Sequence, residues 1–289
     1  MGGLAAAASV VAILAAQEGC DSFATATATP GADAAPTDAL ASSDGGVDAG
    51  PFTCDQNPIF EATLANAPPS TVAIAKGDAV HVAQHLVLTP LDFDGGTATR
   101  KGSLVMPNLL AGRTGFRATF EYSVYINPGQ TGGDGIAIGW ATDPAPELGD
   151  AFGLCPSGST GSGVILATGQ VGTSVASLVD HATPGCSPAA VAAPLVGSQL
   201  LAPGDKTPGP WYSIEVTVGP SRVSYVVAEL DFTTNDAGTA KLSWPRSFAS
   251  GGIGGRPIKH LTLSARTGGD TNNAAHRIRN LKVYACTGE

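Results

Sequence analysis

The stretch Phe116-Arg117-Ala118-Thr119-Phe120-Glu121-Tyr122-Ser123-Val124-Tyr125-Ile126 collects its apolar residues on alternate positions. Successive side chains of an extended strand point to opposite faces, so a period of two predicts a half-buried β-strand. After a turn at Asn127-Pro128-Gly129, residues 135–140 place their large apolar side chains on one face in the same way. Two strands that follow one another in the sequence, with a turn between them, are therefore expected at the centre of the chain.

The same period of two returns in the second half of the sequence. Residues 212–218 alternate, and after Gly219-Pro220-Ser221 an apolar run follows over residues 223–230, which predicts a hairpin. Residues 261–265 and 281–285 mark two late strands, and no segment has a sustained helical repeat. These patterns predict an all-β protein with an antiparallel β-sandwich, or jelly roll, architecture.

Composition divides the chain into three parts. Residues up to about Phe52 are mostly small or polar, and no Lys or Arg precedes Lys76. Such a segment lacks the large apolar side chains from which a core is packed. We therefore predict a leader over residues 1–20, a disordered low-complexity tether over 21–52 and one folded domain over 53–289. The formal net charge is -9 and the basic residues are scattered, which argues against nucleic acid as a partner.

The leader ends at Gly19-Cys20 after an apolar run that is too short to span a bilayer. This arrangement resembles a bacterial lipoprotein signal, in which the cysteine is lipidated and begins the mature protein. It departs from that pattern in lacking a basic start and in having Gln17 three positions before Cys20. The resemblance implies an exported protein held at the outer membrane or cell surface only through a lipid on Cys20. An ordinary cleaved secretory peptide, and hence a secreted protein, is the alternative.

The five cysteines can be divided by the same reasoning. Lipidation of Cys20 leaves an even set, Cys54, Cys155, Cys186 and Cys286, for which three pairings are possible. Cys54 opens the predicted domain and Cys286 nearly closes it, so the nested pairing of 54 with 286 and 155 with 186 is favoured. That pairing requires the first and last strands to be neighbours.

Three stretches of the sequence, taken in order, share their residue types with segments of one known family. They are Gly132-Gly133-Asp134-Gly135-Ile136-Ala137-Ile138, residues 146–154, and residues 263–269 with Asn272, Asn273 and His276 behind them. Together they resemble the concanavalin A-like sandwich and, within it, the L-type (legume-type) lectins. The first stretch resembles the family segment whose Asp holds sugar hydroxyls, the second the loop and Leu-Gly-Leu that follow it, and the third the strand end and loop that complete the site.

The resemblance implies a carbohydrate-binding site for a glycan or polysaccharide. Asp134 is the first candidate, because a carboxylate at a loop-to-strand junction can accept two hydroxyl hydrogen bonds. Glycines beside it allow a ligand to approach backbone N–H groups, although Asp-Gly and Gly-Gly are also ordinary turn chemistry. The predicted site comprises Gly133, Asp134, Gly149, Thr267, Gly268, Gly269 and Asp270.

One departure from the family concerns metal ions. L-type lectins have a strand with metal-binding carboxylates where this chain has residues 164–169, and no acidic residue occurs there. Because calcium needs several oxygen ligands, we expect no resident cofactor. A calcium ion would need other ligands, for which Asp143, Glu147 and Asp150 are available.

The tryptophans and one pair of acidic residues bear on two further questions, stacking on a sugar ring and glycosidase activity. Of the three tryptophans, Trp140 shares a face with apolar residues and is expected in the core, while Trp211 and Trp244 remain open. Glycoside hydrolases of the same sandwich place three acids on one strand; the nearest match, Glu229-Leu230-Asp231, lacks the third. The prediction is therefore a lectin-like protein without enzymatic activity, with a structural or adhesion lipoprotein as the alternative and a glycosidase less supported.

Overall fold

The computed structural model describes residues 52–91, 99–126, 135–141, 161–170, 173–181, 191–194, 211–220, 222–230, 237–247, 258–267 and 274–288. For residues 161–170, 173–181, 191–194 and 237–247 it describes the backbone alone. All of them belong to one compact unit, residues 46–289. Strands and turns account for these residues, and no helix among them is long and apolar enough to cross a membrane.

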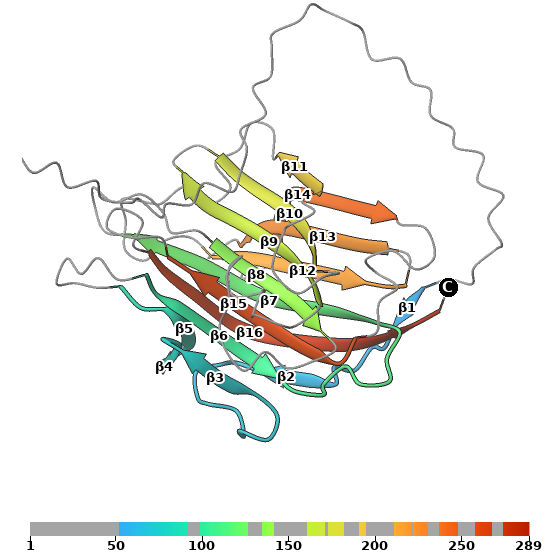
Figure 1. Ribbon diagram of the computed structural model, residues 1–289, viewed down its shortest axis with the longest axis horizontal. Helices are drawn as coiled ribbons and strands as arrows, with labels where there is room; N and C mark the ends of the chain where they lie inside the picture. The colour runs from blue at the N-terminus through green and yellow to red at the C-terminus, as the bar shows by residue number, and fades with distance from the viewer. Residues whose placement is uncertain are drawn as a thin grey trace, which may run out of the picture. The chain divides into compact units, whose positions relative to one another are not determined.

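One sheet has nine strands in the order β14-β13-β12-β7-β16-β5-β4, with β1 and β2 also paired to β16. Its pairs are antiparallel, and β7 and β16 run through its middle side by side (Figure 1). The strands are β1 (Thr53–Cys54), β2 (Phe60–Ala62), β4 (Val80–Val82), β5 (His85–Thr89), β7 (Gly115–Ile126), β12 (Tyr212–Val218), β13 (Arg222–Leu230), β14 (Ala237–Ser247) and β16 (Ala274–Thr287).

The other sheet has seven strands in the order β11-β10-β9-β8-β15-β6-β3, again antiparallel. The predicted strands and the predicted hairpin are confirmed, and so is the all-β antiparallel sandwich. The strands are β3 (Ile74–Gly77), β6 (Lys101–Met106), β8 (Gly135–Ala141), β9 (Gly161–Gln170), β10 (Thr173–His181), β11 (Val191–Pro194) and β15 (His260–Arg266).

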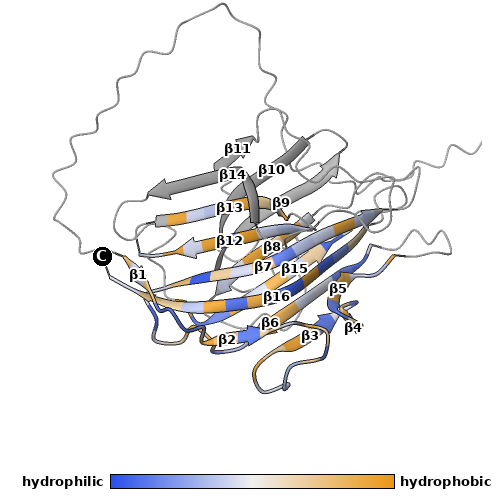
Figure 2. Cartoon of the chain, turned by 180° about the vertical axis from the view of Figure 1, so that it is seen from behind, coloured by the Kyte–Doolittle hydropathy of each residue, from blue (hydrophilic) through white to orange (hydrophobic). Residues whose placement is uncertain are grey.

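Side chains from both sheets form the core between them. Figure 2 shows hydrophobic and hydrophilic residues alternating along β7, β12 and β16, as a sheet buried on one face requires. Trp140 of β8 is 1% exposed and meets the ring of Phe116 of β7 edge to face, with centroids 5.7 Å apart. The prediction that Trp140 belongs to the core is confirmed.

The last strand is longer than its alternation predicted. Residues 281–285 alternate regularly, but β16 begins at Ala274, and its pairing with β7 shifts register between Arg279 and Lys282. Asn280 lies in this irregularity with φ at 52°, a left-handed conformation that asparagine tolerates better than most residues. The extra residue reverses the alternation, which explains why the sequence pattern showed only the second half of the strand.

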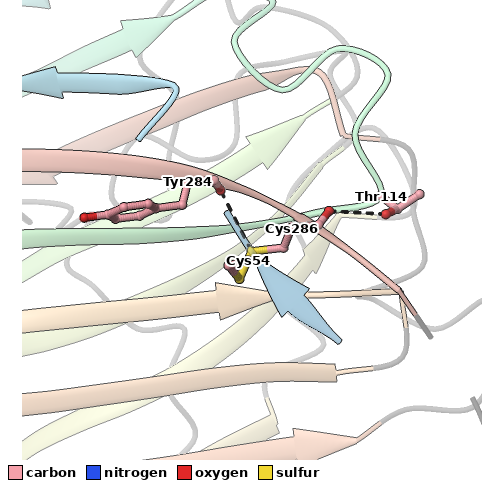
Figure 3. The surroundings of a disulfide bond; sticks show 4 residues. All are labelled: Cys54, Thr114, Tyr284 and Cys286. Atoms are coloured by element: carbon pink, nitrogen blue, oxygen red, sulfur yellow. Dashed lines mark hydrogen bonds between the residues drawn. A yellow bond between two sulfur atoms is a disulfide. The ribbon is translucent and has the colours of Figure 1, made fainter. Parts of the chain in front are cut away.

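The outer disulfide joins Cys54 of β1 to Cys286 of β16, which confirms that pairing (Figure 3). The two cysteines are register partners in adjacent strands, so the first and last strands are neighbours as the pairing required. Thr114 donates its hydroxyl hydrogen to the carbonyl of Cys286 at 3.4 Å. Cys155 and Cys186 lie in parts of the chain that the structure does not describe, so their bridge stays a prediction.

Candidate functional site

Two connections that carry predicted site residues cross between the sheets at the same end of the sandwich. One leaves β7 at Ile126 and enters β8 at Gly135; the other leaves β15 at Arg266 and enters β16 at Ala274. Ile126 pairs with Ala274 in the nine-stranded sheet, and Gly135 pairs with Arg266 in the seven-stranded sheet. Each connection therefore starts on a residue that is paired with the last residue of the other connection.

A third crossing, from β5 to β6, ends at the same place. Thr89 at the end of β5 pairs with His276, and Lys101 at the start of β6 pairs with Arg266. We call the end of the sandwich bounded by these three connections the loop end. Gly133, Asp134, Gly268, Gly269 and Asp270 belong by sequence to the connections of the loop end, but lie outside the described residues.

Thr267, the one predicted carbohydrate-site residue that the structure describes, is held by Arg100, which directly precedes β6. Its side chain is 1% exposed, and its hydroxyl oxygen accepts a hydrogen bond from the backbone N–H of Arg100 at 2.9 Å. Its own N–H donates to the carbonyl of Arg100 at 3.0 Å. The Thr267 side chain is therefore engaged within the protein, and it fixes the point from which the Gly268–Asp270 loop departs.

Asp78 extends this brace to the edge of the seven-stranded sheet. One of its carboxylate oxygens accepts from the N–H of Lys101 at 2.9 Å, and the other faces the guanidinium of Arg100 at 3.3 Å. Both side chains of the ion pair are 32% exposed, so solvent weakens it. Its contribution is to hold the start of β6 in position beside Thr267.

A buried polar network braces the other side of the loop end. Thr89 donates its hydroxyl hydrogen to the carbonyl of Ala274 at 2.9 Å and accepts from the N–H of His276 at 3.2 Å. His276 Nδ1 lies 2.7 Å from the hydroxyl of Tyr122, and the two rings are stacked. Thr89, Tyr122 and His276 are all 0% exposed. Burial lowers the pKa of His276 to about 3, so the imidazole is neutral at physiological pH.

The placement of His276 was not visible in the sequence, which grouped it with the loop behind Gly269. Its side chain is buried in the core instead, at the third residue pair of β7 and β16 counted from the loop end. Sequence reasoning also missed Arg100, Asp78 and Thr89, because none of them stands near a site motif. Only the pairing of β3, β5, β6, β15 and β16 brings them together.

Solved structures with a similar fold are lectins and lectin-like domains. The exoplasmic/lumenal domain of VIP36, in a Ca2+/Man3GlcNAc-bound form, matches with a TM-score of 0.57 and 16% identity, covering 82% of this chain and 91% of that one. The legume lectin-like domain from Entamoeba histolytica matches with a TM-score of 0.54 and 14% identity, covering 78% and 97%. Lectin UEA-II complexed with galactose matches with a TM-score of 0.55 and 14% identity, covering 79% and 98%.

The domain has the legume-type lectin fold. No protein-family model and no curated protein matches the sequence. Identities of 14–16% support the concanavalin A-like sandwich that the motifs implied, and the ligand has to be argued from the residues of this chain.

Within the lectin fold, the strand beside β8 is the one expected to carry metal ligands. β9 pairs with β8 over its length, with Ile138 opposite Val164. It has no Asp, Glu, His or Cys between Gly161 and Gln170, so its residues do not fit a calcium ion. Within the described parts of the chain, no group of three or more His, Cys, Asp or Glu residues is placed to hold a metal.

Gly149 and the alternative metal ligands Asp143, Glu147 and Asp150 belong to residues 142–160, which the structure does not describe. That connection joins β8 to β9 and both of its ends, Ala141 and Gly161, are register partners. They lie at the end of β8 opposite Gly135, whereas Asp134 precedes Gly135. Gly149 therefore remains a prediction from the resemblance alone.

Trp211 is not available for stacking on a sugar ring. It is 6% exposed, and the guanidinium groups of Arg277 and Arg279 lie over its ring, 5.4 and 4.2 Å from the centroid. The Nδ1 atom of His81 contacts the carbonyl oxygen of Leu64 at 3.1 Å. For Trp244 of β14 the structure describes only the backbone.

Proposed function

We propose that the chain is an exported carbohydrate-binding protein whose lectin-like site lies at the loop end of the sandwich. The observation that supports the proposal is the double pairing of the two connections: Ile126 with Ala274 and Gly135 with Arg266. Because each connection starts beside the residue where the other ends, we infer that Asp134 and the Gly268–Asp270 loop face one ligand. The Man3GlcNAc-bound VIP36 domain and the galactose-bound UEA-II lectin share the fold.

In this proposal Asp134 supplies the directional contact. Its carboxylate accepts hydrogen bonds from two adjacent sugar hydroxyls, and Gly133, Gly268 and Gly269 leave room for the ring to approach backbone N–H groups. Thr267 and the network of Thr89, Tyr122 and His276 position the loops without touching the ligand. A rigid support of this kind lowers the entropy that binding has to overcome.

A glycan array probed with the purified protein tests the proposal, followed by titration of the best glycan against Asp134→Ala. A hydrogen bond to a charged group is worth roughly 1.5–3 kcal/mol, so we expect affinity to fall about ten-fold or more. Asp55→Ala is the matched control, because Asp55 is exposed beside β1 at the far end of β16. Equal affinity of Asp134→Ala and Asp55→Ala would reject the site and leave a structural or adhesion role.

Binding in this proposal does not depend on calcium. The reason is that β9, which pairs with β8, has no Asp or Glu side chain that could act as a calcium ligand. Chelator should leave glycan affinity unchanged. Loss of binding on chelation would point instead to Asp143, Glu147 or Asp150 as ligands and would correct this part of the proposal.

Export and anchoring rest on the leader alone. We infer that Cys20 carries a lipid and that residues 21–52 form a spacer, which lets the lectin domain reach ligands away from the membrane surface. Labelling of growing cells with a fatty acid should mark the protein, and Cys20→Ser should abolish the mark. A label that survives Cys20→Ser would leave a simple secretory peptide and a secreted protein.

A further inference from the structure

Four side chains gather on the outer face of the nine-stranded sheet, near the loop end. Trp211 directly precedes β12, and the ring of His85 meets it edge to face with centroids 5.9 Å apart. Arg277 and Arg279 cover the tryptophan from β16. We call Trp211, His85, Arg277 and Arg279 the Trp211 cluster.

Positive charge in the Trp211 cluster exceeds the negative charge that contacts it. Arg279 Nε donates to one carboxylate oxygen of Glu121 at 2.5 Å, and Asn280 donates to the other at 2.7 Å, so both oxygens of this acid are engaged. Arg277 donates to the hydroxyl of Ser123 at 2.7 Å, which is a neutral partner. Among the described residues no carboxylate contacts Arg277, and its buried Nε has no hydrogen-bond partner.

The electrostatic consequence appears on two members of the cluster. Burial, and then the charge of Arg279, lower the pKa of Arg277. Burial, followed by the charges of Arg277 and Arg279, lowers the pKa of His85, so its imidazole is neutral at physiological pH. The two guanidinium groups thus repel each other in a partly desolvated position, and an anion placed against them would relieve that repulsion.

A polar hollow borders the cluster on the same face. It has a volume of about 360 Å³ and shares Glu121 and Asn280 with the surroundings of Arg279. Hydroxyl groups of Thr63, Thr119 and Ser213 contribute to its lining. Hydroxyl, carboxylate and amide groups around a hollow of this size suit a hydroxyl-rich ring better than an apolar ligand.

We propose that the Trp211 cluster and the adjoining hollow form a second binding site, which takes an acidic glycan. The carboxylate or sulfate group binds the guanidinium of Arg277 beside that of Arg279, and the sugar ring lies in the hollow. Arginine suits this role because its planar fork matches an oxyanion with paired hydrogen bonds, and the ring of Trp211 holds the two forks in place. This site lies on the outer face of the sheet and does not use Asp134.

Calorimetric titration of the full-length protein with oligogalacturonate, a sulfated dextran oligomer and a neutral dextran oligomer tests the proposal. We expect the acidic oligomers to bind at low salt, with affinity that falls as salt is added, and the neutral oligomer not to bind this site. Binding of oligogalacturonate alone assigns a carboxylate, binding of the sulfated oligomer alone assigns a sulfate, and binding of both assigns a general oxyanion site. No binding of either acidic oligomer overturns the proposal.

Arg277→Gln should weaken acidic-glycan binding about ten-fold or more, since it removes a charge-assisted hydrogen bond. Arg117→Gln is the matched control, because it removes the same charge from β7, and Arg117 lies over the ring of Tyr284 at 4.3 Å and does not line the hollow. An equal loss in both variants would show unspecific attraction and reject the site. If Arg277→Gln does not fold, Arg277→Lys replaces it, because lysine keeps the positive charge and loses the paired N–H donors of the guanidinium. Unchanged acidic-glycan binding by Arg277→Lys would also reject the site.

The same titrations separate this inference from the proposed lectin site. Asp134→Ala should leave acidic-glycan binding unchanged, and Arg277→Gln should leave binding of a neutral array glycan unchanged. Loss of both activities in Arg277→Gln would mean that there is one site and not two.

Discussion

Acidification should destabilise this protein through one buried histidine. His276 is 0% exposed, stacks on Tyr122 and has its pKa lowered to about 3 by burial. In the unfolded chain its pKa returns to about 6.5. As the pH falls below about 6.5, His276 becomes protonated in the unfolded state but stays neutral in the folded state. The free energy of unfolding therefore falls as the pH falls.

The magnitude follows from these two values. The contribution of His276 is complete above its unfolded pKa and is lost as the pH falls toward its folded pKa. Between about pH 7.5 and pH 5 the loss is about 2 kcal/mol, and any folded pKa below about 4 gives nearly the same figure. A change of this size is a large part of the stability of a typical domain.

The assay is urea unfolding at both pH values, followed by tryptophan fluorescence, for wild type, His276→Gln and Tyr122→Phe. The glutamine amide can retain a hydrogen bond to Tyr122 but does not titrate, so His276→Gln should lose about 2 kcal/mol less on acidification than wild type. Tyr122→Phe removes the 2.7 Å contact to His276 and should cost about 1–3 kcal/mol at neutral pH, while it keeps a pH dependence from the histidine. Carboxylates and His85 titrate in all three proteins and cancel in the comparison. Equal losses in wild type and His276→Gln would refute the reasoning.

Three further predictions concern the disulfides and the packing of the strands. Replacement of Cys54 and Cys286 by Ala opens a loop of 232 residues, and by chain entropy should lower the free energy of unfolding by about 5 kcal/mol, measurable by urea unfolding against the oxidised wild type. In the wild type, non-reducing peptide mapping should recover that bridge together with a peptide linking Cys155 to Cys186; a peptide joining Cys54 to Cys155 would contradict both. Gly102→Ala should destabilise the domain by about 3 kcal/mol or more, because a Cβ there overlaps a backbone carbonyl of β5, and a thermal midpoint equal to wild type would show that the strands can separate to admit it.

The candidate site was predictable in part. Residues 132–138 and 263–269 were recognised from local motifs, because a strand end followed by glycines keeps its residue types within a few positions. Their proximity could not be read from those motifs, since it depends on Ile126 meeting Ala274 in one sheet and Gly135 meeting Arg266 in the other. Thr267 illustrates the limit: its type suggested a ligand contact, and its partner Arg100 lies 167 residues away.

The sequence by itself determined the fold class and favoured the outer disulfide among three possible pairings. Alternation in residues 116–126 and 212–218 is a local property, because each side chain's face depends only on its position along its own strand. Cys54 and Cys286 stand at the two ends of the alternating region, which was enough to favour their pairing. Tertiary structure alone decided the bulge at Asn280, the burial of His276 and the meeting of Trp211 with Arg277 and Arg279. Each of these depends on the register between strands that are distant in sequence, and register is set by the packing of the whole sandwich.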